Sequence, residues 1–577
     1  MALKKWKKKI LWFLLAACVI ASGVDAYYLY KTQKEQADST EKKMAWITER
    51  VIPETVRPGS YLAALNAVFY QDLGEAASLY LKTEQGDPEN KKLLKESYLF
   101  NAVLGRFDEI RSIVSKLHEA KTGGLFVPYV QATYEVKKND WKSARTNIEG
   151  ANAELLNQFL NPLLKAWTYA GEKQFDEAIK ALAPLKEDPG LLSYYFYHRG
   201  LIALTMQLNE EADSAFQELA KKDLMALSLY PEIKTFYLQK KKWNVDNPFF
   251  VKLQLFEAQQ PATTELIMRR PPRVMTPIRG MAEAFYNSST ALGTNKAYFE
   301  KALILSGLSL FLEQKQELPK IWSAEVLEAV KRPELAAHYY KQLAHPLTQT
   351  VAFKKASNLI AIGKTKEALS ILVPLRASNE RSTPLWMALA SAYQKEENWP
   401  AAIAAYSKVL SIEGESNREY ASDIYFMRAF IYTEQKQLAL AEADLKHALD
   451  LNPKNPKILN HLGYQWLEKD VTMEKGFDLV EQAYKLDASD PHIVDSMAYG
   501  YYRKANYKKA LPLAEKTVDK MPQSSVANAH LGDVYLALGR RREAIFQYNK
   551  ALALSYDLTP ELKTELIQKV EKLQASR

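Results

Sequence analysis

Apolar residues recur every three or four positions along most of the chain beyond residue 56, and this spacing predicts amphipathic helices. No segment shows the sustained apolar and polar alternation that is typical of a half-buried β-strand. A lysine-rich start and an apolar run come before this region, and a polar segment over 31–56 separates the two. The pattern therefore predicts an all-α body behind a distinct N-terminal segment.

The helical pattern itself repeats with a period close to 34 residues. In the segment LGDVYLALGRRREAIFQYNKALAL (531–554), Gly532 and Ala544 are small residues among larger apolar ones. Placing Ala544 at position 20 of a unit aligns eleven units along the chain. They begin at Arg57, Lys91, Leu125, Phe159, Ser193, Gln349, Thr383, Ser422, Pro456, Pro491 and Ser525.

The units are aligned on their position-20 residues, so these residues cannot test the alignment. The residues at position 8 can. Ten of the eleven residues there are alanine or glycine, and the exception is Tyr98 of the second unit, which also has Ile110 at position 20. Small residues are needed where the two helices of a unit cross closely. The position-8 residues are Ala64, Tyr98, Ala132, Ala166, Gly200, Ala356, Ala390, Ala429, Gly463, Ala498 and Gly532.

Small residues at positions 8 and 20 of a 34-residue helix-turn-helix unit resemble the tetratricopeptide repeat. The resemblance implies a right-handed α-solenoid whose first helices line a concave groove that binds proteins. Residues 380–555 look like membrane-anchored tetratricopeptide proteins of Gram-negative envelopes. Some relatives of that kind are lipoproteins that serve as adaptors for a periplasmic processing protease and its cell-wall hydrolase substrates. The motif is specific for the fold and says little about the partner.

The register divides the chain into seven segments. Between the two repeat blocks, 227–280 is rich in proline and basic residues, and we interpret it as a linker or as a loop laid across the groove. At the end of the chain, Thr559 is a predicted helix cap with Pro560 at the first helical position. The segments are 1–30, a signal peptide or membrane anchor; 31–56, a polar linker; 57–226, a repeat block; 227–280; 281–348, degenerate helical repeats; 349–558, a second repeat block; and 559–577, a capping helix.

The N-terminal segment has the features of an export signal, with a lysine-rich start followed by the apolar run ILWFLLAA. Three fates are open. Leu15 to Cys18 resembles a lipobox, which makes Cys18 the candidate lipidation residue; Ile10 to Tyr30 is long enough to span a bilayer uncleaved; and Ala21 to Gly23 is a candidate cleavage region. In each case the lysines hold the start inside, which predicts that the repeats lie in the periplasm.

Charge and cysteine content narrow the function further. The net charge is +9, but Lys4, Lys5, Lys7, Lys8 and Lys9 supply five of these charges before any acidic residue, so the remainder carries only +4. This near-neutral body argues against a nucleic-acid partner. Cys18 is the single cysteine, which excludes an internal disulfide.

No catalytic or cofactor motif stands out. The eight histidines form no H-E-x-x-H pair, and the phosphate-binding and nucleophile-elbow motifs are missing. We therefore expect a protein that is not an enzyme, without cofactor, metal or small-molecule substrate. The alternative is an enzyme or glycan-handling protein with its site in 227–348, where the register fails.

The concave face of the last units offers the candidate site. Its positions carry tyrosine and phenylalanine with a few charges, a composition suited to protein contacts. We expect a scaffold or adaptor at the cell envelope that binds protein partners there. The candidate groove residues are Phe430, Lys457, Asn460, Tyr464, Asp495, Tyr499 and Tyr502.

Overall fold

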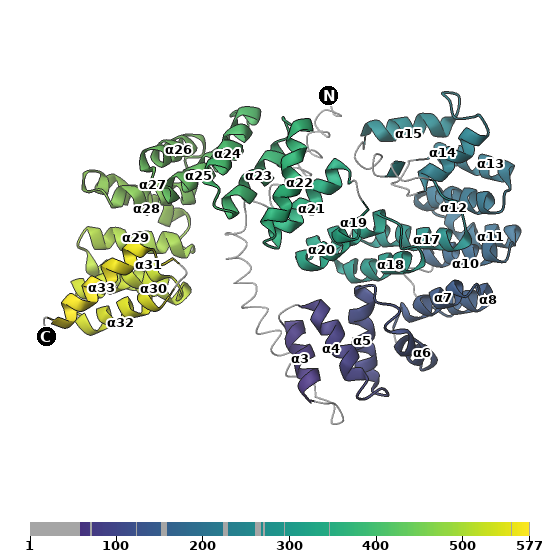
Figure 1. Cartoon of the computed structure of the whole chain (residues 1–577), viewed down its shortest axis with the longest axis horizontal. Coiled ribbons are helices and arrows are strands. Elements are labelled where there is room, and N and C mark those ends of the chain that lie inside the picture. The colour runs from purple at the N-terminus through teal and green to yellow at the C-terminus, as the bar shows by residue number, and fades with distance from the viewer. Residues whose placement is uncertain are drawn as a thin grey trace. The chain divides into compact units, whose positions relative to one another are not determined.

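The computed structural model describes residues 58–69, 72–122, 124–151, 158–222, 229–259, 267–268, 272–293, 295–344, 347–554 and 557–575. All elements in these ranges are helices, so the all-α prediction is confirmed (Figure 1). Among the described helices, none combines the length and apolarity that crossing a bilayer requires. Cys18 and the run from Ile10 to Tyr30 lie outside the described residues.

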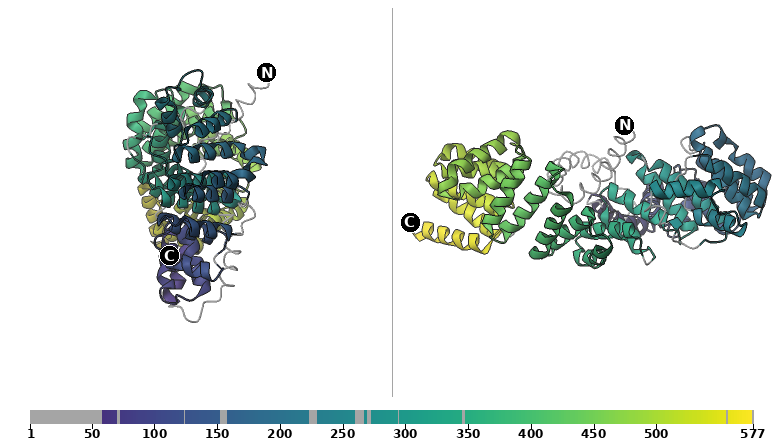
Figure 2. Two further views of the ribbon diagram at one scale, coloured as in Figure 1. Left: turned by 90° about the vertical axis from the view of Figure 1, so that its right-hand side faces the viewer. Right: turned by 90° about the horizontal axis from the view of Figure 1, so that it is seen from above.

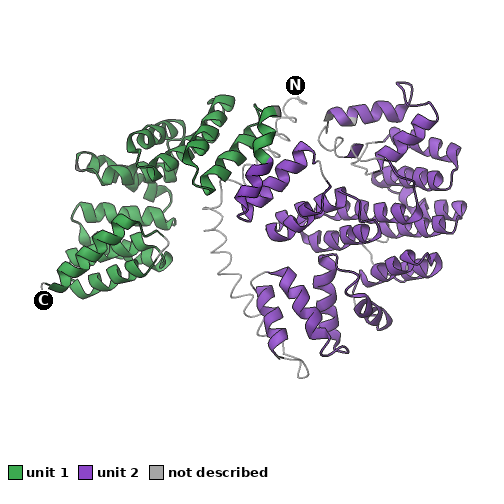
Figure 3. Ribbon diagram, in the orientation of Figure 1, with its two compact units in different colours: residues 1–22, 372–577 green, residues 23–371 purple. Residues whose placement is uncertain are grey.

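The described residues form two compact units, with the boundary between Ile371 and Leu372 (Figure 3). We call residues 58–371 the N-terminal body and residues 372–575 the C-terminal body. In both bodies the helices pack mostly as pairs of chain neighbours, and Figure 2 shows the helices from two further sides. Each pair consists of a first and a second helix, which correspond to the two helices of one sequence unit.

Six successive helix pairs open the N-terminal body. Their first helices are α3 (Pro58–Phe69), α5 (Lys91–Val103), α7 (Val127–Lys137), α10 (Leu160–Gly171), α12 (Leu192–Thr205) and α14 (Tyr230–Gln239). Their second helices are α4 (Leu73–Glu84), α6 (Arg111–Glu119), α8 (Trp141–Glu149), α11 (Phe175–Leu182), α13 (Asn209–Ala220) and α15 (Pro248–Gln259). The body continues with α17 (Pro277–Leu292), α18 (Phe299–Leu312), α19 (Leu318–Ala329), α20 (Pro333–Lys341) and α21 (Gln349–Ala361), and α22 (Thr365–Leu375) crosses the boundary.

The C-terminal body contains five helix pairs and a final helix. The first helices are α23 (Thr383–Lys395), α25 (Arg418–Glu434), α27 (Pro456–Leu467), α29 (Pro491–Arg503) and α31 (Ser525–Ala537). The second helices are α24 (Trp399–Glu413), α26 (Leu438–Leu451), α28 (Met473–Leu486), α30 (Tyr507–Lys520) and α32 (Arg541–Ala553), and α33 (Pro560–Ala575) follows.

The predicted register agrees closely with the helix boundaries. Lys91, Gln349, Thr383, Pro456, Pro491 and Ser525 are each the first residue of a helix. The main deviation is α25, which begins at Arg418 rather than at Ser422. Its start is fixed by Asn417, whose side chain accepts a hydrogen bond from the Tyr420 backbone amide. The additional turn accounts for the longer spacing before this unit.

The small residues lie where the register requires them. A Cβ added to Gly532 would meet the ring of Tyr548 at 2.4 Å, and one added to Gly463 would meet the carbonyl oxygen of Gly476 at 2.9 Å. Position 8 is buried in all eleven units and position 20 in ten; in the unit that begins at Pro456, the buried small residue is Gly476, one residue after position 20. The two helices of each pair therefore approach closely at these points, as predicted.

In most pairs, the turn between the two helices contains a residue in the left-handed backbone region; the turn between α27 and α28 instead holds a short 3-10 helix, Asp470–Thr472. This residue recurs at position 15 of the units and is a glycine only at Gly105, Gly363 and Gly539. Non-glycine residues pay a steric cost of roughly 1 to 2 kcal/mol for this conformation, so the packing of the two helices must impose it. The other residues in this conformation at the turns are Asn139, Lys173, Gln207, Lys241, Lys331, Glu397, Lys436 and Ala505.

Lys241 and Lys331 have the same left-handed conformation at turns outside the eleven units that the sequence aligned. Lys241 lies between α14 and α15, so residues 230–259 hold two helices, in contact where the Phe249 ring meets the Tyr230 and Tyr237 rings, where the sequence predicted a linker or a loop. That prediction was wrong for these residues because proline and basic content suggested a break. The pair folds although its small positions hold Lys234 and Asp246.

Candidate functional site

The concave face of the N-terminal body is filled by the chain's own helices. The first helices α5, α7, α10 and α12 turn one face toward α17 and α18. Helix α17 packs on α10 and α12, and α18 packs on α5 and α7. These are the faces that were expected to line a groove, and in this body they form part of the core.

The burial of the groove positions shows how complete this filling is. Every residue at positions 5 and 9 of the units that begin at Leu125, Phe159 and Ser193 is 0% exposed. A solvent-facing groove would leave such side chains accessible to a partner. These residues are Tyr129, Thr133, Leu163, Trp167, Tyr197 and Leu201.

Glycines allow α17 and α18 to approach this face. A Cβ on Gly280 of α17 would lie 2.2 Å from the Trp167 ring, so only glycine fits there. A Cβ on Gly307 of α18 would lie 3.1 Å from Phe107 and 3.3 Å from the Cα of Gly105. The contact is therefore close-packed at both helices.

A buried polar network fixes α17 in place. The indole nitrogen of Trp167 donates to Nδ1 of His198 at 2.9 Å, and Nε2 of His198 lies 3.1 Å from Oδ1 of Asn287. Because Nδ1 accepts, the proton of the neutral ring is on Nε2, which donates to Asn287. Burial lowers the pKa of His198 to about 4, so the ring is neutral at pH 7.

Charged residues also bond across the packed face of α17. Arg279 of α17 forms a buried ion pair with Glu232 of α14 at 2.8 Å, and Tyr197 donates to Glu283 at 2.9 Å. Arg273 pairs with Glu313 at 3.1 Å. The alternative hypothesis placed an enzymatic or glycan-binding site in 227–348. In the described part of this region, these polar groups instead bond to one another between packed helices.

The same face of the C-terminal body is open. Phe430, at position 9, is 40% exposed, whereas Thr133 and Trp167 at the equivalent position are fully buried. Among the other candidate groove residues, Lys457, Asn460, Tyr464, Tyr499 and Tyr502 are half-buried, and Asp495 is buried. The structure thus leaves all of these side chains except Asp495 accessible on the concave face.

The tyrosines gather around a histidine that was not among the candidates. The Tyr499 ring stacks on the His530 ring with centroids 4.7 Å apart, and it lies 5.4 Å from the Tyr464 ring and 6.2 Å from the Tyr502 ring. Nδ1 of His530 lies 2.9 Å from Asp495. These aromatics therefore pack against one another and face the groove at once. His530 of α31 thus packs against Tyr499 and Asp495 of the neighbouring unit.

The Asp495 carboxylate controls the ionisation of His530. Burial alone would lower the pKa of His530, but the charge and hydrogen bond of Asp495 outweigh it and raise that pKa. The resulting ion pair lies under the tyrosine rings. Asp495 thus holds the His530 ring on which the Tyr499 ring stacks.

A second aromatic group lies one unit earlier. The His461 ring meets the Phe426 ring edge-on at 5.7 Å and lies 6.4 Å from the Phe430 ring. Burial lowers the pKa of His461 to about 4. The neutral ring therefore extends an apolar patch around the exposed Phe430.

Two carboxylates flank these aromatic groups. Burial raises the pKa of Asp423 on α25 to about 6, Glu419 raises it further, and Lys457 opposes both. Burial also raises the pKa of Glu468, the residue that ends α27. Sequence position alone could not single out Glu468, because its proximity to the tyrosines depends on how α27, α29 and α31 stack.

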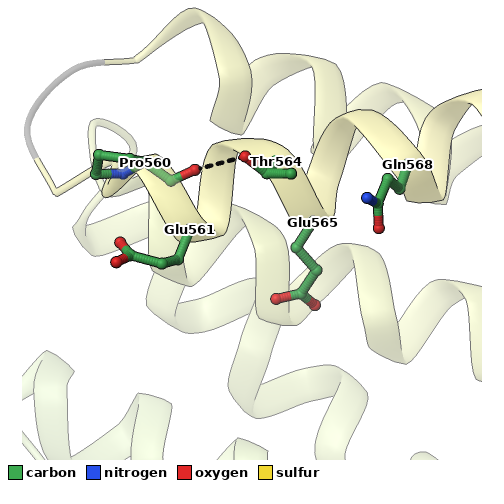
Figure 4. A pocket seen from close by; sticks show the side chains of 5 residues that line it. All are labelled: Pro560, Glu561, Thr564, Glu565 and Gln568. Carbon is green, nitrogen blue, oxygen red and sulfur yellow. Dashed lines mark hydrogen bonds between the residues drawn. The ribbon is translucent and has the colours of Figure 1, made fainter.

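The final helix adds an acidic wall to this body. Glu561, Thr564, Glu565 and Gln568 share one face of α33 and line an open hollow of about 440 Å³ with Pro560 (Figure 4). Lys569 of α33 pairs with Asp533 of the groove at 2.7 Å, which ties the helix to the last repeat. The Thr559 hydroxyl accepts from the Leu562 amide at 3.1 Å, so the predicted cap is confirmed. In the described ranges no cluster of His, Cys, Asp and Glu is placed to hold a metal ion.

Stacked helix pairs, small residues at the crossings and a concave face of first helices define a class of repeat scaffold. The tetratricopeptide repeat family model matches residues 422–455 and 526–557, which are the units that begin at Ser422 and Ser525. The chain therefore contains tetratricopeptide repeats at these units.

Relatives and solved structures of this class share modest identity with the chain. A TPR repeat-containing protein of Pseudomonas aeruginosa is 28% identical over 30% of this chain and 29% of its own length. An antiviral innate immune response effector of Homo sapiens is 27% identical over 24% of this chain and 30% of its own length. The chain therefore matches less than a third of the length of either relative.

Two solved structures are similar at lower identity. A tetratricopeptide repeat protein from Parabacteroides merdae is 16% identical, with 45% of this chain and 99% of that chain covered and a TM-score of 0.36. The APC/C hetero-tetramer Cut9-Hcn1 matches at 14% identity over 92% of this chain and 98% of that chain, also with a TM-score of 0.36.

Proposed function

We propose that this protein is a scaffold that binds a segment of a partner protein in the open groove of its C-terminal body. The observation that carries the proposal is the exposure of aromatic side chains on the first helices of that body. Phe430 is 40% exposed there, while Trp167, at the equivalent position of the N-terminal body, is covered by α17.

The aromatic composition of the open face supports protein recognition. Tyrosine and phenylalanine supply a large contact area with few rotatable bonds, so little entropy is lost on binding. Tyr464, Tyr499 and Tyr502 are already held by mutual ring contacts. A surface that is organised before binding gives higher affinity than one that must become ordered.

The location that we propose is the bacterial cell envelope, with the repeats in the periplasm. The lysine-rich start and the apolar run from Ile10 to Tyr30 support it. Either an uncleaved anchor or lipid on Cys18 would hold the chain at a membrane. In that place the scaffold would serve as an adaptor for a periplasmic protease or a cell-wall enzyme. Mass measurement of the mature N-terminus distinguishes the fates of Cys18, and protection of residues 57–577 from protease only in cells with an intact outer membrane supports the location.

Affinity capture with the full-length chain tests the groove. Envelope extracts are passed over the parent chain, over the double variant Tyr499→Ala/Tyr502→Ala, and over Phe546→Ala as a matched control. Phe546 is an aromatic residue of the second helix α32 and is 65% exposed. Thermal melts confirm that each variant is folded.

We expect proteins captured by the parent to be lost with the tyrosine variant and kept with Phe546→Ala. Equal recovery by all three chains would show that the groove of the C-terminal body is not the binding surface.

A further inference from the structure

The open groove of the C-terminal body has an unbalanced set of charges. Its cations are engaged within the protein: Lys569 pairs with both Asp533 and Glu565 at 2.7 Å, and Arg503 donates to the Leu467 carbonyl at 2.6 Å. Asp423 and Glu468 differ from Asp533, because no ion pair within 4.0 Å involves either of them in the described part of the chain. Among the described residues, Asp423 and Glu468 are therefore carboxylates of this face without a close ion-pair partner, although Lys457 acts on Asp423, and Arg503, Lys469 and His530 act on Glu468.

Glu468 occupies a position that is unfavourable for an anion. It is the residue that ends α27, where unpaired carbonyl groups and the helix dipole already concentrate partial negative charge. A cation that approached this point would interact with both the carboxylate and the helix end. Residue Glu468 is exposed as a whole, so a ligand can reach it, but its carboxylate is partly desolvated: burial raises its pKa although His530, Arg503 and Lys469 act to lower it.

Asp423, on α25, lies near the other end of α27. Lys457, in the first turn of α27, is the cation that acts on Asp423, and Glu419 acts on it from one turn earlier on α25. Burial and Glu419 outweigh Lys457, so the pKa of Asp423 is raised to about 6. The positive charge near Asp423 is thus too small to keep the pKa of its carboxyl group at the ordinary value.

Between these carboxylates lies an aromatic surface. Tyr464 is one turn before Glu468 on α27, and the Tyr499 ring is 5.4 Å from it. Tyrosine rings accept the apolar stem of lysine or arginine and attract its charged end. Glu561 and Glu565 on the wall formed by α33 line an open hollow (Figure 4) and are paired with Lys436 and Lys569.

We propose that the groove of the C-terminal body binds a basic, extended segment of a partner protein, with one arginine or lysine at Asp423 and another at Glu468. This inference rests on the proposed function and specifies the chemistry of the partner. Helix α27 rises about 16 Å between Lys457 and Glu468. An extended chain covers this distance in about five residues, so the two basic side chains are five positions apart.

Fluorescence anisotropy with the purified full-length chain tests this specificity. The probe is the fluorescein-labelled peptide Gly-Arg-Ala-Ser-Ala-Ser-Arg-Ala-Gly. Three companion peptides replace both arginines with glutamate, replace both with glutamine, or move the arginines to positions two apart. We expect the probe to bind most tightly, the glutamine and close-spaced peptides about fivefold or more weaker, and the glutamate peptide weakest.

Two charge-matched double variants locate the site. Asp423→Asn/Glu468→Gln should weaken the probe by about 25-fold, if each exposed pair contributes about fivefold. Glu481→Gln/Asp519→Asn removes two carboxylates from the second helices α28 and α30 and should change affinity by less than twofold. Circular dichroism melts verify folding of both.

The outcomes separate this inference from the function on which it rests. If the glutamate or glutamine peptide binds as well as the probe, or if none of the peptides binds, the basic-segment inference is overturned. Loss of captured proteins with Tyr499→Ala/Tyr502→Ala would still support groove binding in either case. Equal weakening of the probe by both double variants would also overturn the inference, because binding would then follow net charge rather than the groove.

Discussion

The two bodies use the same repeat face in opposite ways. In the N-terminal body, α17 and α18 cover the first helices, and Trp167 is fully buried against Gly280. In the C-terminal body, Phe430 at the equivalent position is 40% exposed, and tyrosines pack around His530 beside it. A tetratricopeptide face thus forms part of the core when it is covered and is accessible to solvent when it is open. The repeat motif alone does not tell these uses apart.

The largest expected effect comes from removing the ring at the centre of the covered face. Trp167→Ala should destabilise the N-terminal body by about 4 kcal/mol, because it leaves a large cavity under α17. Tyr499→Ala, at the same repeat position of the C-terminal body, should cost about 1 kcal/mol because its ring is only half-buried. Hydrogen exchange in increasing urea, followed by mass spectrometry, measures the free energy of opening of each body. Equal losses would mean that the two faces are buried to the same degree.

The same substitution at two helical glycines sharpens the comparison. Gly280→Ala should destabilise the N-terminal body by about 2 kcal/mol, because the new Cβ overlaps the Trp167 ring. Gly59→Ala in α3 meets no atom within 4 Å and should stabilise by up to about 1 kcal/mol. Urea denaturation of both variants provides the measurement. A neutral Gly280→Ala would show that α17 does not sit tightly on α10.

Acid should weaken the covered face. The folded pKa of His198 is lowered to about 4, below its unfolded value near 6.5, so its contribution is complete above pH 6.5 and is lost as the pH falls toward 4. From pH 6.5 to pH 5 the N-terminal body should lose about 2 kcal/mol, as protonation of Nδ1 breaks the Trp167 hydrogen bond. Urea titrations over this pH range test the slope, and His198→Gln should flatten it. An unchanged slope in that variant would assign the acid sensitivity to other groups.

In the C-terminal body the two groove histidines oppose each other. His461 loses its contribution on acidification, because its pKa is lowered to about 4. His530 has a raised pKa, so its contribution is present below pH 6.5 and is lost as the pH rises above its folded value. The same titrations should therefore show that the unfolding free energy of the C-terminal body depends less steeply on pH than that of the N-terminal body. A steeper dependence would contradict the assigned contact between His530 and Asp495.

The smallest effect is expected at the exposed ion pair between Lys436 and Glu561. Both side chains are largely exposed, so Lys436→Gln should leave the unfolding temperature of the C-terminal body nearly unchanged. Thermal unfolding in low and high salt checks this. A larger loss would show that the start of α33 is held mainly by this contact.

The sequence predicted the repeats better than it predicted what covers them. Ala or Gly at position 8 located the close crossings, and six predicted unit starts are the first residues of helices. The pair α14–α15 was missed because Lys234 and Asp246 hold its small positions, while the left-handed turn at Lys241 depends on packing rather than on a glycine.

The filling of the first groove depends on contacts between distant segments, such as the one between Trp167 and Gly280. Two signals in the sequence point to it: apolar residues at most groove positions of the early units, in contrast with Asp423, Lys457 and Asp495 later, and isolated glycines inside the helices of 277–312. Neither signal says which segment covers which face. The fold could therefore be predicted from the sequence, whereas the choice of the open groove as the candidate site required the structure.

Cysteine labelling at one repeat position in each body tests the difference between the two faces most directly. In a Cys18→Ser background, Thr133→Cys and Phe430→Cys each place a single thiol at position 9, on the covered and the open face. Phe430→Cys should react with a bulky maleimide nearly as fast as in the urea-unfolded chain, and Thr133→Cys at least about 100-fold slower, because it must wait for the body to open. Similar rates at the two thiols would contradict the account of a filled groove in one body and an open groove in the other.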